Sequence, residues 1–261
     1  MCDIISFMEN PNIILPLILS LIAGSSTVVG SLIFFFIKDF KHSILSFLMG
    51  LSGGVMIYLS FMEFLPYSVE TVGFVTTNIL FFFGFLVMGL LDFLIPHDYI
   101  QEKIKVVSDD SSKSLLKTGI FIMIGLMLHN FPEGIAVAMS SYSNLKLGLF
   151  LTLAVAMHNI PEGIAVAVPI YYATKNKWQA FKFSFLSGIA EPIGAILALT
   201  LLGPFLNDTI LSYIFAIVAG VMVFISFDEL LPCCFKNGFG HVAISGIAIG
   251  MALMAITICF F

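Results

Sequence analysis

The sequence predicts an all-α integral membrane protein that crosses the bilayer with eight transmembrane helices. Of its 261 residues, 59% are hydrophobic and only 10% are charged, and the mean hydropathy is +1.08. Soluble domains carry about 25% charged residues, so this composition excludes a soluble globular protein. A spanning helix needs about 20 apolar residues. Apolar runs of that length occur at residues 13–37, 44–66, 73–96, 115–142, 145–172, 179–203, 210–231 and 239–260.

The connections between these runs are short, so residues 1–261 are expected to form a single transmembrane domain. The longest connection, residues 97–114, is rich in Ser, Asp and Lys and is predicted to be a solvated loop. Asp3 and Glu9 stand where a cleavable signal has basic residues, so the first apolar run is expected to remain as a helix. The four cysteines have no metal-type spacing and indicate neither a disulfide framework nor a thiolate site.

The lysines predict how the chain is oriented. Every lysine except Lys146 falls in or beside a connection on one side of the eight-helix arrangement, and there is no arginine. Positive residues favour the cytoplasmic side, so the 97–114 loop is predicted to be cytoplasmic and both termini extracytoplasmic. We therefore expect a multi-pass protein of the cytoplasmic (inner) membrane with the lipid bilayer as a partner. A homodimer is a candidate assembly, and no nucleic-acid partner is expected.

Two motifs occur twice in the chain. HNFPEGIAVAM at residues 129–139 and HNIPEGIAVAV at 158–168 differ at only two positions, and they lie on consecutive helices that must cross in opposite directions. SFMEFLP at 60–66 likewise matches SFDELLP at 226–232. A weaker echo links Gly24 and Gly30 of the first helix with Gly188 and Gly194 of the sixth. These pairings predict an inverted repeat, an architecture that is common in secondary transporters.

The first motif places a histidine and a glutamate four residues apart on two helices, as His129 with Glu133 and His158 with Glu162. Residues at this spacing share one helical face. Antiparallel packing of the fourth and fifth helices would then bring two imidazoles and two carboxylates together inside the membrane. Such ligands suit Zn, Fe(II), Mn and Co, and the absence of sulfur argues against Cu(I). The motif therefore predicts a site for a divalent cation.

Each copy of the motif also contains a proline, Pro132 or Pro161, that has no backbone N–H to donate. We expect a kink in each helix and a freed carbonyl oxygen at Leu128 and Met157. A free oxygen beside each histidine fits the same site.

Three further residues extend the candidate site. Asn130 and Asn159 project about 100° away from the histidines, where they either ligate a second cation or brace the first. Glu191 lies among small residues in the sequence GIAEPIG on the sixth helix. Polar contacts that merely join helices are the alternative role. That role is disfavoured because carboxylates are costly inside a membrane and are by default functional there.

Other acids lie nearer the helix ends. Glu63 on the second helix and Asp228 and Glu229 on the seventh are candidate residues of a cation pathway, with simple solvation as the alternative. His97 with Asp98 is a candidate for loose metal binding on the cytoplasmic side.

HNFPEG at 129–134 and HNIPEG at 158–163, followed by AEPIG at 190–194, resemble the ZIP (Zrt/Irt-like protein) family of divalent metal transporters, in particular its bacterial ZupT-type branch. The likeness extends over essentially the whole chain. It implies a bundle with 3+2+3 inverted organisation and a binuclear site built mainly by the fourth and fifth helices. One metal position is implied at His129, Glu133, His158 and Glu162. The second is implied near Asn130, Glu133, Asn159, Glu162 and Glu191, with a glutamate bridging the two.

The resemblance also implies uptake of divalent cations (Zn, Fe(II), Mn, Co and Cd) into the cytoplasm by alternating access, through an elevator-like movement of one bundle against another. The cation is then the substrate, and no catalytic cofactor is expected. Without a cation the neighbouring carboxylates repel each other, so the empty site is expected to hold protons that metal binding displaces. The 97–114 loop lacks the histidine-rich tract of many relatives, which argues against a metal sensor there.

An intramembrane hydrolase is the main alternative. GLSG at residues 50–53 resembles the nucleophile motif of rhomboid proteases, with Ser52 as the nucleophile, and a metal at the histidine and glutamate pairs would activate water. However, HExxH is absent, and an enzyme leaves the repeated motif unexplained, so no enzymatic activity is predicted. A metal-selective channel is a third alternative, which flux rates distinguish from a carrier.

Overall fold

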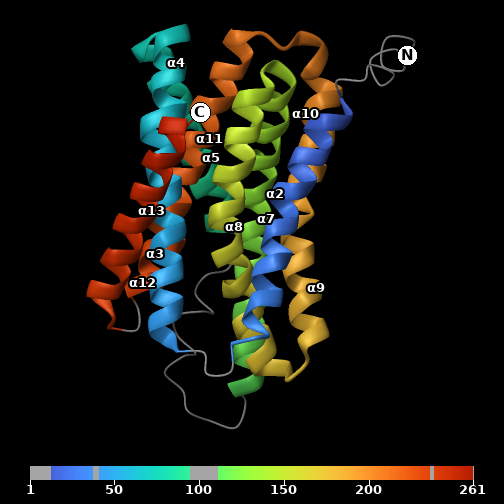
Figure 1. Cartoon of the computed structure of the whole chain (residues 1–261), viewed down its shortest axis with the longest axis vertical. Helices are drawn as coiled ribbons and strands as arrows, with labels where there is room; N and C mark the ends of the chain where they lie inside the picture. Colours follow the sequence, from blue (N-terminus) through green and yellow to red (C-terminus); the bar gives the residue numbers. More distant parts are fainter. Residues whose placement is uncertain (1–12, 38–40, 95–110, 236–237, 261) are drawn as a thin grey trace.

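The computed structural model describes residues 13–37, 41–94, 111–235 and 238–260, which form an elongated bundle of helices (Figure 1). Eight helical segments in this part of the chain are long and apolar enough to cross a membrane, as predicted. The first five spans are α2 (Ile14–Phe34), α3 (His42–Leu59) with α4 (Leu65–Val72), α5 (Phe74–Leu94), α7 (Ser111–Ser143) and α8 (Leu145–Thr174). The last three are α9 (Lys177–Gly188) with α10 (Ala190–Leu201), α11 (Asp208–Ile225) with α12 (Leu231–Phe235), and α13 (Gly240–Phe260).

The second and seventh spans extend beyond the ends predicted at residues 66 and 231. Each passes through one π-helical turn, Ser60–Phe64 between α3 and α4 and Ser226–Leu230 between α11 and α12. Pro66 and Pro232 then fall in the first turn of α4 and α12, the part of a helix that tolerates proline best. The proline therefore does not end the helix. The two copies of SFxxxLP share this uncommon conformation, which supports their assignment as a repeat.

The sixth span is not the continuous helix predicted over residues 179–203. It is interrupted at Ile189, between α9 and α10. Pro192 explains the break, because its missing N–H cannot bond the carbonyl oxygen of Gly188. The interruption places Glu191 in the first turn of α10.

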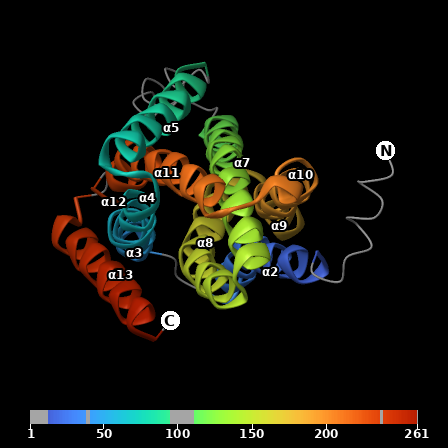
Figure 2. The ribbon, with the colours of Figure 1, turned by 90° about the horizontal axis from the view of Figure 1, so that it is seen from above.

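The spans divide into two groups, as seen along the bundle in Figure 2. We call α2, α7, α8, α9 and α10 the motif bundle, because it contains both HNxPEG sequences. We call α3, α4, α5, α11, α12 and α13 the flanking bundle. Helices pack extensively within each group, and the two groups meet where α3 lies on α8 and α11 lies on α7.

The packing repeats with inverted order along the chain, as the sequence predicts. In the motif bundle, α2 packs on α8 and α10 on α7, while in the flanking bundle α3 packs on α13 and α11 on α5. Gly30 of α2 lies against the carbonyl of Ile160, and Gly194 of α10 lies against the carbonyl of Phe131. Ile160 and Phe131 are equivalent positions of the repeated motif. The first three and last three spans thus surround the α7–α8 pair in a 3+2+3 arrangement.

Small residues hold the flanking bundle together, and they provide a test of the packing. A side chain at Gly54 would overlap the backbone carbonyl of Ile247 on α13, whereas at the neighbouring Gly53 the nearest atom is Leu230 Cβ at 3.6 Å. We expect Gly54→Ala to lower the free energy of unfolding by about 1–3 kcal/mol through overpacking, and Gly53→Ala to leave it unchanged or slightly raised. Denaturant unfolding in detergent micelles, followed by circular dichroism, measures both. Equal stability of the two variants would contradict this packing.

Candidate metal centre

The tight turn between α7 and α8 sets the two motifs at the same depth. Only Asn144 separates the helices, and its side-chain oxygen accepts hydrogen bonds from the backbone N–H groups of Lys146 (2.9 Å) and Leu147 (3.3 Å). This is the usual way in which Asn caps a helix N-terminus. Because the helices are antiparallel and the turn lies midway between the motifs, His129 and His158 come to the same level. Pro132 and Pro161 lie inside continuous helices, and the predicted kinks stay a prediction.

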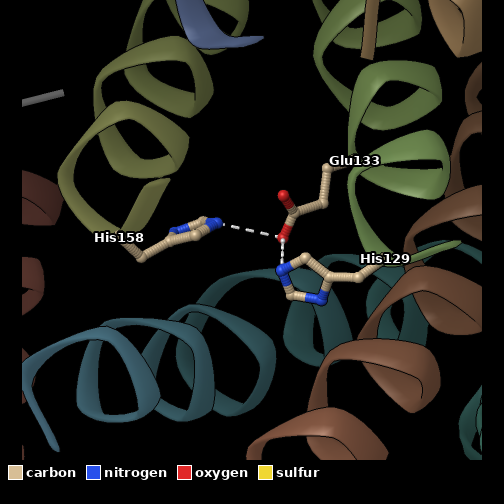
Figure 3. Close-up of side chains that lie close together, drawn as sticks. All are labelled: His129, Glu133 and His158. Atoms are coloured by element: carbon tan, nitrogen blue, oxygen red, sulfur yellow. Dashed lines mark hydrogen bonds and ion pairs between the residues drawn. The ribbon is translucent and has the colours of Figure 1, made fainter. Parts of the chain in front are cut away.

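The two histidines and two glutamates of the motifs lie in one buried cluster. His158 Nε2 lies 3.0 Å from Glu133 Oε1, and His129 Nε2 lies 3.4 Å from the same oxygen (Figure 3). His129 Nε2 is also 3.5 Å from Glu162 Oε1. All four residues are at most 1% exposed. The ligand atoms of His129, Glu133 and His158 all lie within 4.8 Å of one another, and Glu162 adjoins this group through His129.

The asparagines and Glu191 adjoin this cluster. Asn159 Nδ2 donates hydrogen bonds to Glu191 Oε1 and to the carbonyl oxygen of Ala23 (3.2 Å). Asn130 Nδ2 donates to the carbonyl oxygen of Ser187 (3.2 Å). Ala23 and Ser187 precede the equivalent glycines of the repeat, so the inversion extends to these hydrogen bonds. Each amide nitrogen thereby fixes its side chain to a neighbouring helix of the motif bundle.

Five side-chain oxygens of these residues are buried and have no hydrogen-bond partner among the described residues. Their atoms are Glu133 Oε2, Glu162 Oε2, Glu191 Oε2, Asn130 Oδ1 and Asn159 Oδ1. A buried polar atom without a partner costs about 1–3 kcal/mol, and several from one cluster are unusual. They belong to the residues predicted to hold the second metal position, and oxygen is a donor that divalent cations accept.

Of the candidate pathway acids, one lies beside the site. The carboxylate of Glu229 contacts Gly125, one turn before His129 on α7, where the missing side chain makes room for it. Asp228 is exposed, and Glu63 is half-buried on the π-helical turn of the second span. His97 and Asp98 lie outside the described residues.

On the side of the α7–α8 turn, the site is bordered by apolar side chains. A small cavity next to Glu133 is otherwise lined by apolar residues, among them Leu151, Val218 and Met222. Leu151 and Met222 are almost completely buried. The packing thus closes the site toward this end of the bundle.

Ser52, the nucleophile of the hydrolase alternative, has a different role in the structure. Its side chain is fully buried, and its hydroxyl donates a hydrogen bond to Glu162 Oε1 (2.8 Å). A nucleophile must be accessible to substrate and activated by a base, whereas this hydroxyl is enclosed against the cluster of histidines and glutamates. The sequence alone does not reveal this contact, because only the packing of α3 on α8 brings Ser52 to Glu162.

Comparison with known proteins agrees with the geometry. The model of the family described as "ZIP Zinc transporter" matches residues 96–258. Zinc transporter ZupT of Oceanobacillus iheyensis is 48% identical, with 95% of this chain and 98% of the relative aligned. Zinc transporter ZupT of Lysinibacillus sphaericus is 46% identical over 95% of this chain and 97% of the relative. That of Streptococcus mutans is 43% identical over 94% and 96%. The chain belongs to the ZIP family of zinc transporters.

Proposed function

We propose that this protein takes up divalent transition-metal cations, with zinc foremost, across the cytoplasmic membrane. The observation that carries the proposal is the convergence of two imidazoles and two carboxylates, all buried, on the antiparallel pair α7 and α8. The relatives named zinc transporters support the same substrate class. Membership of a transporter family also confirms the prediction that the chain is not an enzyme.

The donor atoms fit this substrate class. Zinc is bound by imidazole nitrogen and carboxylate oxygen, commonly with four ligands, and the first position offers His129, Glu133, His158 and Glu162. Fe(II), Mn, Co and Cd are further candidates, because the same ligand types accept them with different preference. A cation that enters exchanges its hydration shell for these groups. The ligands must be deprotonated to bind, so we expect metal binding to release protons.

A second cation next to the first is supported by the unpartnered oxygens. We assign to it Asn130, Asn159 and Glu191, with Glu133 and Glu162 able to reach both positions through their two carboxylate oxygens. The donors of this second position are oxygens alone, so its preference should be shifted away from zinc and toward cations that favour oxygen.

The second position predicts a change in metal stoichiometry. With zinc and Mn(II) both supplied, Glu191→Ala should reduce the bound metal from two ions per chain to one, because it removes the carboxylate that only the second position uses. Equilibrium dialysis of the purified protein, with metal measured by mass spectrometry, gives the count. Asp228→Ala, which removes an exposed acid of the flanking bundle, should leave it at two. One ion per chain in the unmodified protein would contradict a binuclear site.

Alternating access is supported by the division into two bundles. The metal ligands belong to the motif bundle, and apolar packing against the flanking bundle closes the site toward the α7–α8 turn. Movement of one bundle along the other would open that end, which the lysine distribution predicts to be extracytoplasmic. Glu63 is then a candidate for the outer part of the pathway and Glu229 for the inner part.

Metal uptake into liposomes that contain the purified protein tests the function. Initial rates for Zn, Fe(II), Mn and Co are measured against metal concentration, with protein-free liposomes as the control. Saturable uptake at rates of a carrier supports the proposal, and flux that rises without saturation indicates a channel instead. Absence of uptake for every cation, in protein that still binds metal, would contradict transport.

A further inference from the structure

One hydrogen bond to the metal cluster comes from outside the motif bundle. Ser52 belongs to α3 of the flanking bundle, and it donates to Glu162 Oε1 on α8 of the motif bundle at 2.8 Å. Both side chains are fully buried, so water does not compete for this contact. A hydroxyl that donates to a buried carboxylate makes a strong, charge-assisted hydrogen bond. It therefore fixes the orientation of Glu162.

The inverted repeat has no second hydroxyl at the equivalent place. Ser60 corresponds to Ser226 in the repeated SFxxxLP motif, so Ser52, eight residues earlier, corresponds to Val218. Val218 borders the same cavity as Glu133, the repeat mate of Glu162, but it has no group to donate. The two glutamates consequently differ. Glu133 Oε1 faces both histidines, whereas Glu162 Oε1 faces His129 alone and accepts from the serine.

The consequence for a cation lies in how Glu162 presents its oxygens. The serine holds Oε1 beside His129 Nε2 (3.5 Å), and Oε2 has no hydrogen-bond partner among the described residues, so a cation at the histidines meets only one oxygen of Glu162. A carboxylate held in this way binds each cation through one oxygen, which suits the four-ligand geometry of zinc. Larger cations with more oxygen ligands gain from carboxylates that bind through both oxygens.

We propose that Ser52 is a positioning residue that acts through Glu162 and favours zinc over larger, oxygen-preferring cations such as Mn(II). The inference rests on the proposed metal site. It assigns to the flanking bundle a part in metal selectivity, although that bundle provides none of the proposed ligands.

Metal binding by three variants tests this assignment. Dissociation constants for Zn(II) and for Mn(II) are measured separately by equilibrium dialysis on the purified full chain. In Ser52→Ala the preference for zinc over Mn(II) should fall about tenfold, the effect of losing one hydrogen bond to a charged group. Ser52→Thr keeps the hydroxyl and should keep the preference. Val218→Ala, the matched change at the repeat mate, should leave it unaltered.

The results separate this role from general damage and from the proposed function. An unchanged preference in Ser52→Ala, or an equal loss in Val218→Ala, would overturn the role of Ser52 even if zinc uptake into liposomes is normal. If Ser52→Ala lost the preference for zinc over Mn(II) but the unmodified protein showed no uptake, the role of Ser52 would be supported and transport would be contradicted. Absence of metal binding by the unmodified protein would overturn both. Because the comparison of Ser52→Ala with Val218→Ala decides the question, poor folding of the threonine variant does not prevent the test.

Discussion

Replacing Glu133 with alanine is expected to abolish saturable zinc uptake. Its Oε1 atom lies 3.0 Å from His158 Nε2 and 3.4 Å from His129 Nε2. Its Oε2 atom has no hydrogen-bond partner among the described residues. Loss of a residue that only supports metal ligands already lowers metal affinity or activity about 10- to 100-fold, and Glu133 is itself a proposed ligand. We therefore expect a loss of at least about 100-fold in the ratio of maximal rate to KM.

Uptake into liposomes at equal amounts of incorporated protein measures this loss. Glu70→Ala is the matched control, because Glu70 is an exposed acid on α4 away from the cluster. It should transport at the unmodified rate. If Glu133→Ala retained normal zinc uptake, the α7–α8 cluster would not be the transport site.

Removing both histidines should weaken zinc binding even further and change the metal preference. His129→Ala/His158→Ala leaves only oxygen donors at the first position. Residues that merely support metal ligands contribute about 10- to 100-fold in affinity, so loss of two ligands should lower zinc affinity by more than about 100-fold. Mn(II) affinity should fall less, because oxygen ligands suit it better than imidazole.

Calorimetric titration of zinc and Mn(II) into the purified variants gives both affinities. His42→Ala/His241→Ala removes two exposed histidines of the flanking bundle and serves as the control. If the His129/His158 variant bound zinc within about twofold of the unmodified affinity, the zinc site would lie elsewhere, because removal of two ligands should have a much larger effect.

The candidate site was predictable from sequence to an unusual extent because its residues are repeated. His129 with Glu133 and His158 with Glu162 lie four residues apart on long apolar segments, and helical geometry alone assigns each pair to one face. Because the motif is duplicated on consecutive antiparallel helices, the two faces come to lie at the same depth in the membrane. The structure confirms that these side chains meet, and the family match confirms the transporter class.

Prediction was less successful for the bounds of three helices that contain proline. The apolar runs predict ends at residues 66 and 231, beside Pro66 and Pro232, but the π-helical turns before these prolines let both helices continue. Pro192 has the opposite effect and breaks the sixth span. A proline removes one backbone donor in every case, and the local turn decides whether that donor is needed.

The sequence by itself determined the eight spans, the inverted repeat and the ligand types, because these follow from the length of apolar runs and from spacing within one helix. Only the tertiary structure decided the division into two bundles, the contact of Glu229 with Gly125, and the hydrogen bond from Ser52 to Glu162. Ser52 and Glu162 are 110 residues apart in the chain. Contacts of this kind depend on how separate helices pack. Helices in a membrane pack through small residues along their whole length, and no local sequence pattern specifies which helices will meet.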